Sequence, residues 1–228
     1  MIKMNIEKVC HRVREVCARA KIDPSKITML CVTKGRSLEQ ILEVVSSGIN
    51  HLGENRVQEA EQKYRLVPQA DWQMVGHLQS NKVKDALKIF DLIHSVDSVS
   101  LAQEINKQAL KMNKIQDILL EVKTSPEVRK FGFKPEVLDK VWEEIAKFQN
   151  VKIKGLMTIA PLGDDANETR PYFSKLRRLR DRLNPDWLLS MGMSSDFEVA
   201  IEEGTDIIRL GRAIFEGTEP PINNGHIS

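Results

Sequence analysis

The feature that most constrains this chain is an alternation between short apolar segments and amphipathic segments, repeated eight times between residues 27 and 211. Short apolar runs are typical of strands buried on both faces of a parallel sheet, and amphipathic segments are typical of helices that cover such a sheet. Because eight strand–helix units close a (β/α)8 TIM barrel, the chain is predicted to be an α/β protein with this fold. The predicted strands cover 27–32, 49–53, 72–75, 92–96, 115–122, 151–159, 187–190 and 206–210.

One more helix is predicted in front of the barrel, over residues 1–22, where apolar residues recur at helical spacing. No linker or repeat divides the sequence, so residues 1–228 are predicted to form a single domain with a flexible tail over 217–228. An open doubly wound sheet would use the same elements, but it would normally carry a glycine fingerprint after its first strand. The residues Lys34-Gly35-Arg36 do not form one.

Two capping-box patterns predict where helices begin. Ser37 stands three residues before Gln40, and Ser195 stands three residues before Glu198. In such a box the serine side chain accepts a backbone hydrogen bond from the third helical residue, whose own side chain reaches back.

Composition excludes several classes of function. Lysine and arginine number 34 against 32 for aspartate and glutamate, a balance that gives no field to attract nucleic acid or an anionic membrane. The basic residues between 175 and 182 alternate with apolar ones at helical spacing, which is typical of the solvated face of a helix. Three scattered cysteines indicate a reducing compartment, and we find no signal peptide or apolar run of about 20 residues, so a cytoplasmic location is expected.

Candidate functional residues stand where predicted strands end, because ligands bind at the carboxyl ends of strands in α/β folds. Lys34 follows the first strand, although a surface lysine would also fit that place. The loops after strands seven and eight contain Gly192, Ser194, Gly211 and Arg212, which suit a phosphate group. Closure of the barrel would put Lys34 beside these loops. Lys34 could then neutralise a phosphate as a point charge or form a Schiff base with pyridoxal phosphate.

Arg209 helps to choose between these readings. It is a charged residue within a buried strand, which is costly unless it is paired. It could face the pyridine nitrogen of pyridoxal phosphate, or it could bind a structural carboxylate. His77 follows the third predicted strand and His94 lies within the fourth. A backbone carbonyl commonly satisfies a histidine at such places, and Glu54 is interpreted as structural. No spacing of histidines and acids predicts a metal site, and no catalytic triad is indicated.

Motifs spread over nearly the whole chain resemble those of the pyridoxal phosphate homeostasis proteins. They are VTK at 32–34, GENRVQE at 53–59, GHLQSNK at 76–82, HSVDS at 94–98, KFG at 130–132, GLMT at 155–158, LSMGMS at 189–194 and RLG at 209–211. The resemblance implies a fold type III barrel like the N-terminal domain of alanine racemase. It also implies that pyridoxal 5′-phosphate is the cofactor and that Lys34 holds it as the internal aldimine.

The same resemblance assigns roles to the other candidate residues. Ser194 and the backbone at Gly211 and Arg212 would hold the phosphate, and Arg209 would face the ring nitrogen. Arg212 departs from the pattern, because the family usually has a small hydroxyl residue there; a guanidinium turned inward could bind the phosphate more tightly, and a lost hydroxyl could loosen it. The residues that would line the ring pocket are Asn55, His77 and Met157.

Two arguments favour a carrier over an enzyme. A pyridine nitrogen facing arginine stays largely unprotonated and is a poor electron sink, and the chain ends soon after Arg212, where racemases of this fold continue into a C-terminal domain that brings a second base. The chain is therefore predicted to be a monomeric, non-catalytic protein of vitamin B6 and amino-acid homeostasis. Apo enzymes or a regulatory protein are its expected partners. The alternatives are an amino-acid racemase and a phosphosugar enzyme without pyridoxal phosphate.

Overall fold

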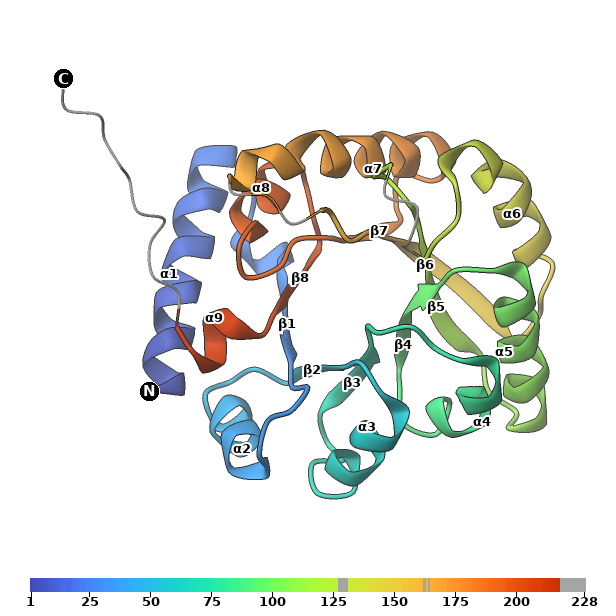
Figure 1. Ribbon diagram of the computed structural model, residues 1–228, viewed down its shortest axis with the longest axis horizontal. Coiled ribbons are helices and arrows are strands. Elements are labelled where there is room, and N and C mark those ends of the chain that lie inside the picture. Colours follow the sequence, from blue (N-terminus) through green and yellow to red (C-terminus); the bar gives the residue numbers. More distant parts are fainter. Residues whose placement is uncertain (127–130, 162, 164, 218–228) are drawn as a thin grey trace.

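The computed structural model describes residues 1–126, 131–161, 163 and 165–217, and eight parallel strands among them close into a barrel in chain order (Figure 1). Strand β1 (Thr28–Val32) pairs with β8 (Ile207–Leu210) from Thr28 opposite Ile207 to Cys31 opposite Leu210. The predicted (β/α)8 barrel is confirmed. The other strands are β2 (His51–Glu54), β3 (Asp71–Met74), β4 (Leu92–Val96), β5 (Gln116–Glu121), β6 (Val151–Met157) and β7 (Leu188–Ser190).

The helices lie outside the ring of strands, as amphipathic connections between parallel strands must (Figure 1). The predicted first helix is present as α1 (Ile2–Ala20). The others are α2 (Leu38–Ser46), α3 (Val57–Tyr64), α4 (Val83–Ala86), α5 (Val99–Lys111), α6 (Leu138–Ile145), α7 (Arg170–Leu183), α8 (Phe197–Glu202) and α9 (Arg212–Phe215). Short 3-10 turns cover Pro24–Lys26, Ser80–Lys82, Pro135–Val137 and Ala166–Thr169.

One of the two predicted capping boxes is present. The Ser37 side chain accepts from the backbone of Gln40, whose own side chain accepts from the Ser37 backbone. The Ser195 box is wrong: α8 begins after Asp196, whose carboxylate accepts from the backbone of Met193 at 2.6 Å. Asp196 is therefore already engaged with the loop before the helix, and the Glu198 side chain turns to Arg12.

Apolar side chains form two layers. The larger lies between strands and helices and includes Trp72, Phe90 and Phe173, all fully buried. The smaller lies inside the ring of strands. Its members are Leu30, Val75, Leu92, Leu119, Met157 and Ile207. Buried polar side chains two positions away on the same strands share this inner face with them, among them Gln73, His94 and Arg209.

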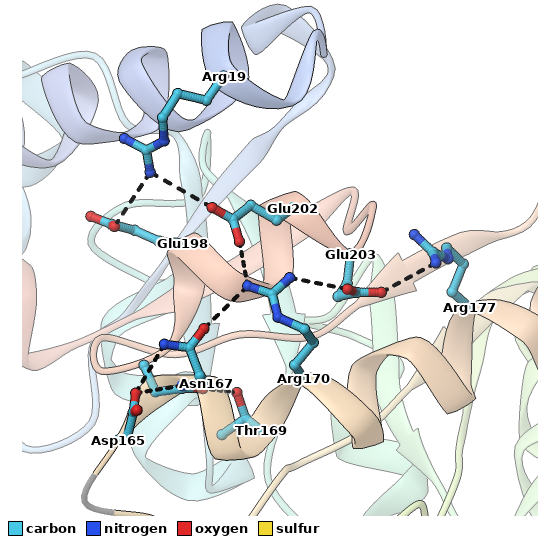
Figure 2. A network of polar contacts seen from close by, with 10 residues as sticks. Arg19, Asp165, Asn167, Thr169, Arg170, Arg177, Glu198, Glu202 and Glu203 are labelled. Carbon is cyan, nitrogen blue, oxygen red and sulfur yellow. Dashed lines mark hydrogen bonds and ion pairs between the residues drawn. The ribbon is translucent and has the colours of Figure 1, made fainter.

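A network of ion pairs ties the first helix to the last part of the barrel, as Figure 2 shows. Arg170 at the start of α7 contacts Glu202 and Glu203 at the end of α8, and Arg19 of α1 reaches Glu202 at 3.7 Å. Each exposed pair contributes little alone, but the shared glutamates make a network. This network holds α8 in place, and the loop that leads into α8 carries Ser194.

Two predicted features lie outside the described residues. One is Lys130 of the KFG motif, and the other is the tail beyond Gly217. Among the helices that the structure describes, none combines the length and apolar character needed to cross a bilayer.

Candidate functional site

A cavity of about 550 Å³ opens at the carboxyl ends of the strands, and we call it the mouth cavity. Six of the eight predicted site residues line it, drawn from β1, β2, β7 and β8 and the loops after them. Among the described lining residues, none is acidic. The predicted residues that line it are Lys34, Asn55, Ser194, Arg209, Gly211 and Arg212, and the others are Val32, Val75, Ile159, Ala160 and Met193.

The remaining two predicted residues lie around this cavity. His77 lines a neighbouring cavity of about 470 Å³, which shares Asn55 with the mouth cavity. The His77 ring stacks on Phe131 at 3.9 Å between centroids, and its Nδ1 lies 3.1 Å from a carboxylate oxygen of Asp97. Met157 is fully buried in the inner apolar cluster. Their contact with a ligand stays a prediction.

The backbone on either side of Lys34 is held in a clamp by two residues of α3, Lys63 before it and Glu59 after it. The Lys63 ammonium donates to the carbonyl oxygen of Thr33 at 2.6 Å and to Glu59 at 2.7 Å. The Glu59 carboxylate in turn accepts from the backbone N–H of Gly35. Gly35 has a φ of +67°, which a glycine adopts without strain. The backbone before and after Lys34 is thereby fixed.

Glu54 completes this clamp and does so as a structural residue. Its side chain is fully buried and accepts from the Thr33 hydroxyl at 2.7 Å and from the Lys63 ammonium. Its second oxygen accepts from the backbone N–H of Asn55 at 3.1 Å. All these groups donate hydrogen bonds to the Glu54 carboxylate oxygens, so the structural interpretation of Glu54 fits its environment.

The loop between β7 and α8 brings Ser194 to the cavity. Gly192 has a φ of +93°, and a side chain there would meet the Ala200 Cβ at 2.5 Å, so only glycine allows this close packing. The Ser194 hydroxyl accepts from the backbone N–H of Ala213 in α9 at 3.1 Å. The loops after β7 and β8 are therefore joined beside β1, as barrel closure predicts.

Arg209 is buried and bound only to neutral oxygens among the described residues. Its Nη1 donates to the carbonyl oxygen of Ser190 at 2.8 Å and to the hydroxyl oxygen of Ser190 at 2.7 Å. Its Nη2 donates to the carbonyl oxygen of Thr158 at 2.8 Å. The alternative that a structural carboxylate binds Arg209 is wrong for the part of the chain described. Burial lowers the pKa of Arg209 to about 10, so the guanidinium keeps its charge at neutral pH.

His94 is fully buried and satisfied by side chains rather than by the expected backbone carbonyl. Its Nδ1 lies 2.9 Å from the Ser190 hydroxyl, and its Nε2 lies 2.8 Å from the side-chain oxygen of Gln73. Burial, and then the charge of Arg209, lower the pKa of His94 to about 3. The imidazole is therefore neutral at physiological pH.

Glu121, which the sequence reasoning missed, is a further titratable group close to Arg209. It is the last residue of β5 and only 7 % exposed. Burial raises the pKa of Glu121 to about 7; repulsion from Asp97 adds to this rise, and attraction to Arg209 opposes it. An acidic residue at the end of a buried apolar strand was the signal that could have singled it out.

Comparisons with known proteins agree with this geometry. Residues 4–219 match the family model for the alanine racemase N-terminal domain. The chain is 43% identical to a pyridoxal phosphate homeostasis protein of Aquifex aeolicus, over 92% of this chain and 95% of that one. A homeostasis protein of the same name from Vibrio cholerae is 35% identical over 94% of this chain and 95% of its own. The structure of PipY from Synechococcus elongatus with PLP bound has a TM-score of 0.81 and 35% identity, covering 94% of this chain and 100% of that one.

Proposed function

The chain belongs to the alanine racemase N-terminal domain family and to the pyridoxal phosphate homeostasis proteins, and we propose that it binds pyridoxal 5′-phosphate in the mouth cavity. One observation carries the proposal: the cavity joins a primary amine, two guanidinium groups and a hydroxyl, with no acidic side chain among its described lining residues. This set of groups fits an aldehyde that also carries a phosphate dianion.

Each lining residue has a role that follows from its chemistry. Lys34 would hold the aldehyde carbon covalently. Lys63 and Glu59 hold the backbone on either side of Lys34 and so fix the position from which its side chain extends. Ser194, with the backbone of Gly211 and Arg212, would hold the phosphate. Arg209 would face the ring nitrogen, and Asn55, His77 and Met157 would surround the ring. When bound, the cofactor supplies an aldehyde that reacts reversibly with amines.

The position of Arg212 at the mouth cavity supports tighter phosphate binding rather than looser binding. Arg212 is exposed and lines the mouth cavity, and it forms no ion pair with the residues that the structure describes. A free guanidinium at this place can make two parallel hydrogen bonds to a phosphate, which a small hydroxyl residue cannot.

A holding role is favoured over turnover. The relatives are named homeostasis proteins, and Arg209 donates hydrogen bonds while keeping its own proton at neutral pH. A group that does not release a proton leaves a ring nitrogen unprotonated, which disfavours carbanion chemistry. The proposed role is to hold or deliver pyridoxal phosphate in vitamin B6 and amino-acid homeostasis, with apo enzymes or a regulatory protein as partners.

Chemical trapping tests the binding site directly. Purified chain is mixed with pyridoxal phosphate, reduced with borohydride and digested, and the labelled peptide is identified by mass spectrometry. We expect visible absorbance before reduction and a label on Lys34. Lys82→Ala, which removes an amine from the neighbouring cavity, should keep the label, whereas Lys34→Ala should lose it. A labelled Lys34→Ala protein, or an unlabelled wild type, would refute the proposal.

The enzyme alternative has its own test. The loaded protein is incubated with a panel of L-amino acids, and the products are separated by chiral chromatography. We expect no inversion above that of free pyridoxal phosphate. Inversion that disappears in Lys34→Ala would establish a racemase instead of a carrier.

A further inference from the structure

A chain of hydrogen bonds crosses the lumen of the barrel from Arg209 to the opposite end. Arg209 Nη1 lies 2.7 Å from the Ser190 hydroxyl, which lies 2.9 Å from His94 Nδ1. His94 Nε2 lies 2.8 Å from the Gln73 side-chain oxygen, and Gln73 Nε2 lies 3.0 Å from a carboxylate oxygen of Asp71. Asp71 is the first residue of β3, at the amino end of the barrel, whereas Arg209 lines the mouth cavity at the carboxyl end.

The donor and acceptor at each hydrogen bond of this row follow from Arg209. A guanidinium can only donate, so the Ser190 oxygen accepts from Arg209. The Ser190 hydroxyl hydrogen can then be donated to His94 Nδ1. A neutral imidazole has one donor and one acceptor nitrogen, so the proton of His94 lies on Nε2 and is donated to Gln73.

Asp71, at the other end of this row of hydrogen bonds, requires the same assignment of donors and acceptors. The Asp71 carboxylate also binds His51 Nδ1 at 2.6 Å. Burial alone would raise the pKa of Asp71, but its hydrogen bonds with His51 and Gln73, the charge of His51 and the contact with Asp91 together lower that pKa. An ionised carboxylate only accepts, so the amide nitrogen of Gln73 must face Asp71 and its oxygen must face His94. His94 therefore has to donate from Nε2, whichever end is considered first.

We propose that His94 is a positioning residue for the mouth cavity: as the Nε2–H tautomer it accepts a hydrogen bond from the Ser190 hydroxyl at Nδ1 and so orients the Ser190 oxygen to accept from Arg209. Three hydrogen bonds use both Nη1 hydrogens and one Nη2 hydrogen of Arg209. The second Nη2 hydrogen and the Nε hydrogen have no partner among the described residues and are left for a ligand. The inference rests on the proposed function only for the identity of that ligand.

His94 is thus fixed from a distance by Asp71 and Gln73, which touch neither Arg209 nor the mouth cavity. Without His94, the Ser190 hydroxyl could rotate and turn its hydrogen toward the guanidinium. Arg209 would then lose one of its two bonds to Ser190 and with it part of its fixed orientation.

The first test needs no cofactor. Long-range proton–nitrogen correlation spectra of the ¹⁵N-labelled full chain report which imidazole nitrogen of each histidine carries the proton, and the signal missing from His94→Gln assigns His94. We expect a protonated Nε2 and an unprotonated Nδ1. The Nδ1–H tautomer, an equal mixture or a charged ring would overturn the proposal, whatever affinity the variants have for pyridoxal phosphate.

The second test separates positioning from packing. His94→Phe keeps the volume of the ring and removes both bonds, whereas His94→Gln can still accept from Ser190 and donate to Gln73. We expect the dissociation constant for pyridoxal phosphate to rise about tenfold in His94→Phe, the effect of losing one hydrogen bond to a charged group, and to be largely rescued in His94→Gln. Equal losses in both variants would indicate a packing role and refute the proposal.

A double-mutant cycle then asks whether His94 acts through Ser190. In a Ser190→Ala background, His94→Phe should raise the dissociation constant little further, because the link is already broken. Additive losses would contradict the proposal. A wild-type chain that binds no pyridoxal phosphate would refute the proposed function, and the tautomer spectrum would still decide the assignment of His94.

Discussion

Lys63 and Arg209 are both buried cations near Lys34, and the chain satisfies them in opposite ways. Lys63 is 8 % exposed and contacts the carboxylates of Glu54 and Glu59. Arg209 is 6 % exposed and, within the described chain, contacts only the neutral oxygens of Ser190 and Thr158. Asp196 and Glu121 influence Arg209 only from beyond contact distance.

This difference distinguishes a cation that supports the fold, Lys63, from one that is available to a ligand, Arg209. The charge of Lys63 is neutralised inside the protein, so this cation can only hold the loop around Lys34 in place. The charge of Arg209 is oriented but not neutralised, and burial of such a charge is costly. A ligand that accepts from Arg209 offsets part of that cost. The partners of each buried cation, rather than its burial alone, therefore distinguish Arg209 of the proposed binding site from Lys63 of the scaffold.

The largest expected effect comes from removing Lys63. Lys63→Met would leave Glu54 buried without its cation, and we expect the free energy of unfolding to fall by about 3–5 kcal/mol. Urea denaturation followed by circular dichroism measures this, with the exposed Lys84→Met as the matched control. A loss below about 1 kcal/mol would mean that Glu54 does not depend on Lys63, and the contrast with Arg209 would collapse.

The pH dependence of stability should test whether Glu121 is protonated and so leaves the charge of Arg209 without a counter-charge. The pKa of Glu121 is raised from 4.5 to about 7 in the folded chain. Between these values the unfolded chain releases a proton that the folded chain still holds, so the free energy of unfolding falls as pH rises. For Glu121 we expect a loss of about 3 kcal/mol between pH 5 and pH 8.

Urea denaturation of the cofactor-free wild type and Glu121→Gln at both pH values isolates this contribution. The variant should lose the pH dependence, whereas Glu61→Gln on the surface of α3 should keep it. An unchanged slope in Glu121→Gln would mean that Glu121 is ionised throughout and compensates Arg209 much as Glu54 compensates Lys63.

Removing Arg209 should affect binding. Arg209→Met deletes the donors that remain for a ligand, and we expect the dissociation constant for pyridoxal phosphate to rise between about tenfold and a hundredfold. Absorbance titration measures the change, with Arg178→Met on the outer face of α7 as the charge-matched control. Equal affinities in the two variants would remove Arg209 from the site.

The smallest effect is expected at Thr33. Thr33→Val keeps the shape of the side chain and removes one of the donors to Glu54, and we expect a loss of about 1 kcal/mol in the free energy of unfolding. The dissociation constant for pyridoxal phosphate should change little, because Lys63 still holds the carbonyl of Thr33. A large loss of affinity would show that the clamp tunes Lys34 as well as supporting it.

The sequence predicted the barrel and most of the mouth cavity because both depend on local signals. Apolar runs identified the strands, and the rule that ligands lie at strand ends identified Lys34 and Ser194. Arg209 was identified as a charged residue within a buried strand. Helix α9 was not predicted, since its four residues, Arg212–Phe215, are too few to show a period. The Ser195 box failed because Asp196 binds the backbone of Met193.

The two polar networks were beyond sequence reasoning for another reason. Lys63 looks like any lysine on a polar helix, and its partner Glu54 lies on a different element. Inward positions such as Gln73, His94 and Ser190 can be listed from strand alternation, but which of them meet depends on how the strands stagger around the barrel. Such contacts are a property of the closed fold.

The pairing of β1 with β8 has a consequence for synthesis on the ribosome. Lys34 is made early and Arg209 late, and they line one cavity only because the last strand inserts beside the first. A nascent chain that lacks β8 has its amine but neither Arg209 nor the loop that follows it, so it cannot assemble the binding site. Contacts this distant in sequence form late in folding. The chain is therefore expected to bind the ligand only after β8 has paired with β1, so that only fully synthesised molecules would bind it in the cell.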